Sequence, residues 1–171
     1  MKFIPVKSLD AVAGDATVHA VVRELAACHA SQPGALLPLL HAVQDRFGHV
    51  PAEGVPVIAE ALNLSRAEVH GVISYYHHFR SAPAGRVLLQ VCQAEACQAR
   101  GATQLAEDAE RIAGCSMHGT SADGSVTLEP VYCLGLCALS PALQIGDRPH
   151  ARMTPERFDA AVAAAGSGSD T

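Results

Sequence analysis

The sequence predicts a small all-helical bundle followed by an α/β domain. Between residues 17 and 80, apolar residues recur every three or four positions, which is the spacing of one helix face. A Ser-Ala-Pro-Ala-Gly stretch at 81–85 interrupts this pattern and is typical of a linker. After it, short β-prone runs alternate with helical patterns, as they do in α/β domains. We therefore expect a helical domain at 17–82 and an α/β domain at 83–165.

The two ends of the chain show no such periodicity. Residues 1–16 contain Pro5 and Gly14, and we expect them to form an N-terminal arm. The arm has no core-forming pattern of its own, so a partner would be needed to order it. The Gly-Ser-rich end at 166–171 is expected to be a disordered tail.

The first two helices are expected at 17–30 and 35–47, with a Ser-Gln-Pro-Gly break between them. The apolar face of the first helix extends to Cys28, which we interpret as an inert thiol in the core. The second helix ends before Gly48, and glycine is the residue that most often caps a helix C-terminus.

The third helical stretch opens at Pro51, and the fourth begins with a capping box. In this motif the Ser65 side chain accepts from the backbone N–H of Glu68, while the Glu68 side chain reaches back to Ser65. The fourth helix is expected to run to about Tyr76. We interpret the adjacent His77-His78 pair as solvated residues that suit a helix C-terminus.

The second half of the chain combines strands and helices. Strands are expected at 86–91, 126–132 and 142–145, and helices at 99–112 and from Thr154-Pro155 onward. Residues 114–124 are expected to form a loop. Pro130 predicts an irregular or edge position for the second strand, because proline lacks a backbone N–H. Gly146-Asp147 predicts a hairpin turn after the third strand.

Composition narrows the possible functions and the cellular location. The net charge is −5, which argues against a nucleic-acid partner. No apolar run reaches the roughly 18 residues that a membrane span requires, so we expect no membrane insertion. The N-terminus lacks the apolar region of a signal peptide, and we therefore expect a cytoplasmic protein. In that reducing compartment, clustered thiols indicate metal or redox chemistry rather than structural disulfides.

Four of the six cysteines form two closely spaced pairs, Cys92-x4-Cys97 and Cys133-x3-Cys137. Each pair follows an apolar run that predicts a strand. Because adjacent strands bring their ends close together in space, the two pairs can converge. Four thiolates suit either Zn²⁺ or an iron–sulfur cluster. Gly135 and Gly101, near these pairs, would let backbone N–H groups approach the sulfurs.

Several interpretations of these cysteines compete. A structural zinc site usually has shorter C-x2-C spacings, and a thioredoxin-type redox pair requires a C-x-x-C motif that is absent here. Four unrelated core cysteines would not be expected to gather at strand ends. A [2Fe–2S] cluster has two irons, and two separated pairs match one pair per iron, so the spacing favours a cluster over zinc.

The motifs VCQAEACQARG and CLGLCALSPALQI resemble the thioredoxin-like [2Fe–2S] ferredoxin family, whose best-known member is the 24-kDa subunit of NADH:ubiquinone oxidoreductase. The resemblance covers about residues 34–165, including the helical stretch LLPLLHAVQDRFGHVPAEG. Within the family, EACQARG and YYHHFRSAPAGR look most like the gamma subunit of soluble NAD-dependent formate dehydrogenases. The diaphorase-type subunit of NAD-linked hydrogenases is also similar.

The resemblance implies a thioredoxin-like fold that holds one [2Fe–2S] cluster. Cys92 and Cys97 would bind one iron, and Cys133 and Cys137 the other. It also implies a partner subunit that binds FMN and NAD(H) and, in a formate dehydrogenase, a molybdenum-containing catalytic subunit. A cis peptide bond before Pro141 would fit the thioredoxin-like fold.

The resemblance thus implies an electron-transfer subunit of a cytoplasmic NAD-dependent formate dehydrogenase complex. The chain contains no recognisable nucleotide or substrate motif, so we expect it to have no catalytic residues. The alternatives are the equivalent subunit of an NAD-linked hydrogenase or of a respiratory NADH dehydrogenase, and a zinc-stapled assembly module. The respiratory subunit often has TFYTMF where this chain has SYYHHF, which argues against the respiratory assignment.

Three residues outside the two pairs are further candidates for the site. Cys115 and His118 lie together in a loop, but two ligands in a loop would make a poor metal site. Glu95 is expected to face solvent, because a buried carboxylate next to a negatively charged cluster would be unfavourable.

Overall fold

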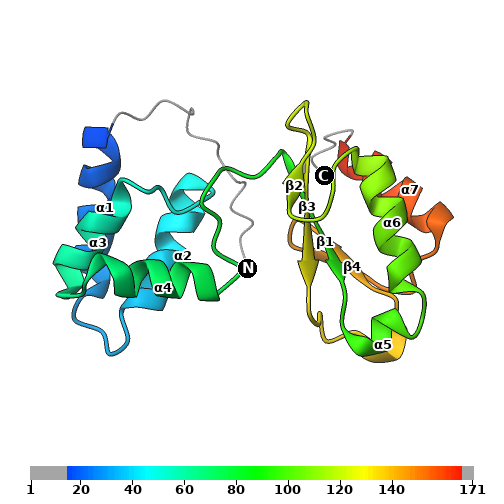
Figure 1. Ribbon diagram of the computed structural model, residues 1–171, viewed down its shortest axis with the longest axis horizontal. Helices are drawn as coiled ribbons and strands as arrows, with labels where there is room; N and C mark the ends of the chain where they lie inside the picture. Colours follow the sequence, from blue (N-terminus) through cyan, green and yellow to red (C-terminus); the bar gives the residue numbers. More distant parts are fainter. Residues whose placement is uncertain (1–14, 167–171) are drawn as a thin grey trace. The chain divides into compact units, whose positions relative to one another are not determined.

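The computed structural model describes residues 15–166 (Figure 1). Residues 1–14 of the expected arm and residues 167–171 of the expected tail lie outside the described residues. The chain divides into two compact units between Pro83 and Ala84, and each unit has a hydrophobic core of its own. Within residues 15–166, no helix is long and apolar enough to cross a membrane.

The described part of the first unit is all-helical, as expected. Its helices are α1 (Asp15–His29), α2 (Leu36–Phe47), α3 (Gly54–Leu62) and α4 (Arg66–Tyr75). The expected start of the third helix at Pro51 is three residues too early. Residues 51–54 form a turn instead, in which the Gly54 N–H donates to the Pro51 carbonyl at 3.0 Å.

Local capping signals in this unit are confirmed. Ser65 and Glu68 form the expected capping box: the Glu68 N–H donates to Ser65 Oγ at 3.2 Å, and the Ser65 N–H donates to Glu68 Oε2 at 2.7 Å. These bonds satisfy backbone donors that a helix start would otherwise leave unpaired, and they lower the pKa of the Glu68 carboxyl. Gly48 caps α2 in the left-handed conformation at φ 76°.

The core of the first unit takes an apolar stripe from every helix. Fully buried members are Val22, Leu39, Ile58 and Val69. Gln44 of α2 is buried with them, and both ends of its side-chain amide are bonded: Nε2 donates to the His78 carbonyl at 2.9 Å, and Oε1 accepts from the Arg80 N–H at 2.7 Å. These bonds hold the segment after α4 against α2.

The interpretation of Cys28 as a core thiol is wrong, because its side chain is exposed. The buried stripe of α1 runs through Val18, Val22 and Ala26, which are four residues apart. Since an α-helix turns about 100° per residue, position 28 lies about 200° from Ala26, on the opposite side of the helix.

The second unit is built on a mixed five-stranded sheet with the order β2-β3-β1-β4-β5. The strands are β1 (Val87–Cys92), β2 (Gly119–Thr120), β3 (Val126–Val131), β4 (Leu143–Ile145) and β5 (Arg148–His150). Central strand β1 pairs in parallel with β3 and antiparallel with β4. The α/β class and the three expected strands are therefore confirmed, as is the hairpin between β4 and β5.

Helices of the second unit are α5 (Glu95–Gln98), α6 (Ala102–Ala113) and α7 (Pro155–Gly166), with a 3₁₀ turn, η1, at Cys137–Leu139. Figure 1 shows α6 and α7 on the same side of the sheet. Phe158 of α7 is fully buried in one core with Leu89 of β1 and Leu128 of β3. The Ser140–Pro141 peptide bond is cis, as expected.

One expectation for the sheet needs correction, and another is met only locally. The expected loop at 114–124 contains β2, whose two residues are too few to show a strand period. Pro130 does not place β3 at an edge of the sheet, because β3 lies between β2 and β1. Strand β2 pairs only with Thr127 and Leu128, so Pro130 is paired with β1 alone, opposite Val91. A strand without a partner on that side tolerates the missing N–H of proline.

The turn before β3 is held by one carboxylate. Asp123 Oδ1 accepts from the Ser121 hydroxyl at 2.6 Å, and from the Ser125 N–H and hydroxyl at 3.0 and 2.7 Å. These bonds hold the pKa of the Asp123 carboxyl well below its usual 3.8, and the bond from Ser121 has the largest effect. Because the pKa of Asp123 is lower in the folded than in the unfolded chain, its ionised carboxylate stabilises the fold at pH values above the unfolded-state pKa. This stabilisation is lost as the pH falls from there through the folded-state pKa.

We predict that Asp123→Asn lowers the melting temperature of the full chain by about 2–4 °C at pH 7. The difference should shrink below about pH 4, where the unfolded carboxyl of the wild type becomes protonated. Thermal unfolding of both proteins between pH 2.5 and 7 measures this. An equal difference at both ends of that range would contradict a stabilising role for the carboxylate charge.

Candidate metal centre

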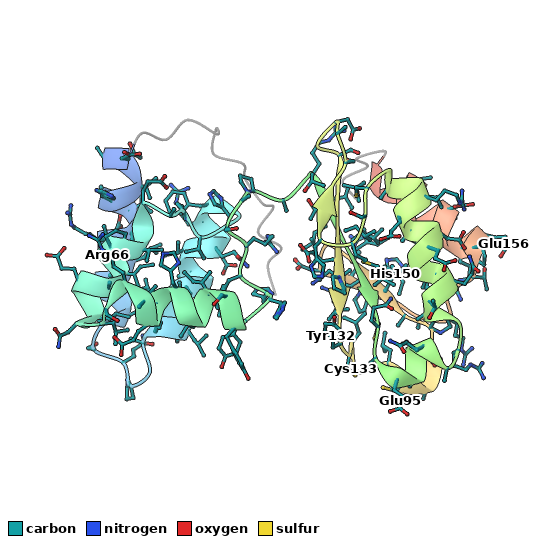
Figure 2. The ribbon with its side chains drawn as sticks, viewed as in Figure 1. Arg66, Glu95, Tyr132, Cys133, His150 and Glu156 are labelled. Carbon is teal, nitrogen blue, oxygen red and sulfur yellow. The ribbon has the colours of Figure 1, made fainter. Side chains whose placement is uncertain are left out.

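The parallel pairing of β1 and β3 brings the two cysteine pairs to one end of the sheet. Cys92 is the last residue of β1 and lies opposite Val131, the last residue of β3. Cys133 follows Val131 by two residues. Figure 2 shows Cys133 at the end of β3, at the same end of this unit as Glu95 of α5. The expected convergence of the two loops is therefore present.

The first pair is buried. Cys92 and Cys97 are each 2% exposed, and Cys97 lies on the short helix α5. The Cys92 N–H donates to the Ala142 carbonyl at 3.1 Å, which fixes the end of β1 against the residue before β4. Burial, and then a side-chain hydrogen bond with Cys92, raise the pKa of the Cys97 thiol.

The second pair is exposed. Its sulfur atoms, Cys133 Sγ and Cys137 Sγ, are 3.7 Å apart, and the Gly135 N–H donates to Cys133 Sγ at 3.3 Å. Cys133 has a φ of 147°, a region that only glycine adopts readily, so the loop holds this residue in an unfavourable conformation. The hydrogen bond with Cys133, and then the charge of that thiol, raise the pKa of Cys137.

The two pairs also lie close to each other. The charge on Cys137 raises the pKa of Cys97, and the charge on Cys92 raises that of Cys137. Leu134 and Leu136 of the second loop pack against the cluster of buried residues that contains Cys92 and Cys97. In residues 15–166, no group of three or more His, Cys, Asp or Glu is arranged to hold a single metal ion.

The donor set fits a two-iron cluster with one pair of thiolates per iron. In tetrahedral metal–thiolate coordination with bonds of about 2.3 Å, two sulfurs on the same metal lie about 3.8 Å apart. Cys133 and Cys137 already match this at 3.7 Å. Since the thiols must be deprotonated to act as ligands, metal binding would release their protons.

The Gln93 side chain is a second feature that is compatible with a bound cluster, and no sequence motif indicated it. Its side-chain Nε2 is buried and has no hydrogen-bond partner among the described residues. Its backbone is bonded to both cysteine-bearing segments, because its N–H donates to the Val131 carbonyl at 2.7 Å and its carbonyl accepts from Gln98 Nε2 at 2.8 Å. A buried, unpaired amide costs about 1–3 kcal/mol, and a sulfur atom of a bound cluster would be a suitable acceptor.

The other sequence candidates have separate roles. Cys115 Sγ donates to the Gly119 carbonyl at 3.6 Å, whereas His118 Nδ1 lies 3.1 Å from Glu129 Oε2. The loop therefore gives these two residues different hydrogen-bond partners. Glu95 is exposed, as expected.

Comparison with known proteins identifies the fold and its cofactor. Residues 22–165 match the family model described as thioredoxin-like [2Fe-2S] ferredoxin. The chain belongs to this family. As a thioredoxin-like ferredoxin it carries one [2Fe–2S] cluster, a group that transfers electrons.

Relatives of this ferredoxin include components of larger redox enzymes. An NADH-quinone oxidoreductase subunit of Rhizobium meliloti is 31% identical over 144 residues, which cover 84% of this chain and 86% of the relative. NADP-reducing hydrogenase subunit HndA of Solidesulfovibrio fructosivorans is 30% identical over 122 residues, or 71% of each chain.

A solved structure agrees with the fold. A chain of an NAD⁺-reducing [NiFe]-hydrogenase in the air-oxidised state superposes with a TM-score of 0.67 at 23% identity. The superposition covers 81% of this ferredoxin but 24% of the hydrogenase chain, so this ferredoxin spans about a quarter of that chain. At this identity the likeness establishes the fold alone.

We propose that Cys92, Cys97, Cys133 and Cys137 are the cluster ligands. Replacing Cys97 or Cys137 with alanine removes one thiolate, so bound iron should fall from about two atoms per chain to below one. Iron analysis and the EPR spectrum of the reduced protein measure the effect. Cys28→Ala and Cys115→Ala are matched controls that should keep full iron, and circular dichroism checks the fold. Full iron with an unchanged EPR spectrum in either ligand variant would exclude that residue.

Proposed function

We propose that this ferredoxin is the electron-transfer subunit of a cytoplasmic NAD-dependent formate dehydrogenase complex, next to a subunit that binds FMN and NAD. The observation that carries the proposal is the convergence of the two cysteine pairs, one buried and one exposed, at one end of the sheet. A bound [2Fe–2S] cluster accepts and releases one electron at a time, which complements a flavin that exchanges hydride with NAD.

The buried and exposed cysteine pairs would have different roles in holding the cluster and in electron transfer. Buried Cys92 and Cys97 would anchor the cluster within the second unit. Exposed Cys133 and Cys137 would hold it near the surface, where an electron could pass to a partner. The Gly135 N–H, which donates to Cys133 Sγ, would partly neutralise the negative charge of the thiolate.

The surface next to the exposed pair suits a protein partner. Tyr132 directly precedes Cys133 and is 69% exposed, and Leu139 lies two residues after Cys137 and is 36% exposed. Exposed aromatic and aliphatic side chains are typical of protein interfaces. We infer that the FMN- and NAD-binding subunit contacts this surface, and that the molybdenum-containing subunit acts through it.

The choice of formate as the electron donor is supported by the resemblance of EACQARG and YYHHFRSAPAGR to formate dehydrogenase gamma subunits. The alternatives are the equivalent subunits of a hydrogenase and of a respiratory NADH dehydrogenase, and relatives of both kinds are known. An alternative of another class is a zinc-stapled module that only assembles its partners.

Anaerobic purification of the tagged chain from its source organism tests these functions. We expect a brown complex with about two irons and two sulfides per ferredoxin chain, a flavin subunit and a large molybdenum-containing subunit. Formate should then reduce NAD⁺ in the preparation. A nickel-containing subunit would instead assign the chain to a hydrogenase, and a colourless protein with one zinc per chain would contradict electron transfer.

We predict that Gln93→Leu lowers the reduction potential of the cluster by about 30–60 mV, where 59 mV is a tenfold change for a one-electron couple. The physical reason is that an N–H···S hydrogen bond from Gln93 to the cluster would stabilise the extra negative charge of the reduced form, and leucine cannot donate one. Redox titration followed by EPR measures the shift.

Gln144→Leu is the matched control for Gln93→Leu, because the Gln144 amide is already bonded to Gln90 Oε1 and the Gly146 carbonyl. It should leave the potential unchanged. Equal potentials in the Gln93 variant and the wild type would show that the Gln93 amide does not reach the cluster.

A further inference from the structure

The two cysteine pairs differ sharply in their access to solvent. Cys92 and Cys97 are each 2% exposed, whereas Cys133 and Cys137 both lie on the surface. We propose that in the cluster-free chain Cys133 and Cys137 form a reversible disulfide with a small-molecule disulfide, such as glutathione disulfide, as the oxidant. This bond blocks cluster uptake. The blocking step rests on the proposed ligand roles, whereas formation of the disulfide does not.

The geometry of the exposed pair favours this bond. The sulfur atoms are 3.7 Å apart and would need to move about 1.7 Å closer to reach the S–S bond length of about 2.05 Å. Between them lies a short surface loop whose central residue, Gly135, is exposed. Cys137 begins a 3₁₀ turn of only three residues, so no long helix has to move.

The reaction is a double thiol–disulfide exchange. The thiolate of one cysteine attacks the S–S bond of glutathione disulfide, which forms a mixed disulfide and releases one glutathione thiolate. The neighbouring cysteine thiolate then attacks the protein sulfur of the mixed disulfide and releases the second glutathione. In total the two protein thiols lose two electrons and two protons, and one glutathione disulfide is reduced to two glutathione molecules.

The buried pair is protected from the same oxidant. Three partly buried side chains pack against the group of buried residues that contains Cys92 and Cys97, namely Ala94, Leu134 and Leu136. Glutathione disulfide is much larger than either thiol, and its S–S bond must come into direct contact with the attacking protein thiolate. Oxidation should therefore begin at Cys133 and Cys137, although the buried thiols also lie close together.

The disulfide would regulate cluster insertion. An oxidised Cys133–Cys137 pair has no thiolate to offer, so only the buried pair could bind iron, and a two-iron cluster needs ligands on both irons. Reduction by a thiol restores both ligands. The exposed pair would thus be kept from over-oxidation until iron and sulfide are supplied under reducing conditions.

The first experiment maps the bond in the full-length, cluster-free chain. After treatment with glutathione disulfide, free thiols are alkylated in denaturant and the peptides are analysed by mass spectrometry. We expect the peptide with Cys133 and Cys137 to be unalkylated, while Cys92 and Cys97 are alkylated. In Cys133→Ser, Cys137 should instead keep a stable glutathione adduct. Oxidation of Cys92 and Cys97 first, or two free thiols at 133 and 137, would overturn the proposal.

The second experiment tests the consequence for cluster uptake. Cluster formation from iron and sulfide is followed by visible absorption in oxidised protein and in the same protein after dithiothreitol treatment. We expect uptake to be at least tenfold slower in the oxidised protein and fully restored by dithiothreitol. Equal uptake would overturn the regulatory role. If the fully reduced protein takes up no cluster, the ligand assignment fails, whereas the mapped disulfide stands.

Discussion

The parallel pairing of β1 with β3 is the constraint on which the metal centre depends. Its register places Cys92 opposite Val131, and this fixes where both cysteine loops begin. The hydrophobic core maintains this register, because Leu89 and Leu128 face each other in it and are almost fully buried. A slip of one residue would turn these side chains away from α6 and α7, and would separate the cysteine pairs as well. The same strand pair therefore sets the core packing and the positions of the proposed ligands.

The difference in burial between the two pairs reflects two opposing requirements. A thiolate-bound cluster carries negative charge, and burying charge without hydrogen bonds or a counter-charge is unfavourable. An electron carrier, on the other hand, must bring its cluster near a partner. With the four cysteines as the proposed ligands, the buried pair would anchor the centre, and the exposed pair would lie near a partner, with the Gly135 N–H donating to Cys133 Sγ. Burial is also the main cause of the raised pKa of the Cys97 thiol, because a low-dielectric environment disfavours the thiolate.

Sequence reasoning succeeded where the deciding interactions are local. The Ser65–Glu68 capping box and the Gly48 cap each depend on a few neighbouring residues, and the helical and α/β halves follow from periodicity. It failed where contacts with residues distant in the sequence determine which side chains are buried. Cys28 fitted a helical stripe by counting, yet the faces of α2 and α3 select a different side of α1 for burial. The unpaired Gln93 amide and the unequal exposure of the cysteine pairs depend on how the loops pack, and no motif encodes either.

The metal centre alone does not determine which enzyme the ferredoxin serves, because relatives in hydrogenases and quinone-linked enzymes share the same family fold. The segment in which this chain departs from the respiratory pattern lies in the first unit, after α4. There the His78 ring contacts the rings of His41 and Phe79, and its backbone carbonyl is bonded to buried Gln44. Burial, and then the charges on His41 and Arg80, lower the pKa of His78, which favours a neutral ring at pH 7. The His78 side chain is exposed, as expected from the sequence, while its backbone carbonyl links the segment after α4 to α2.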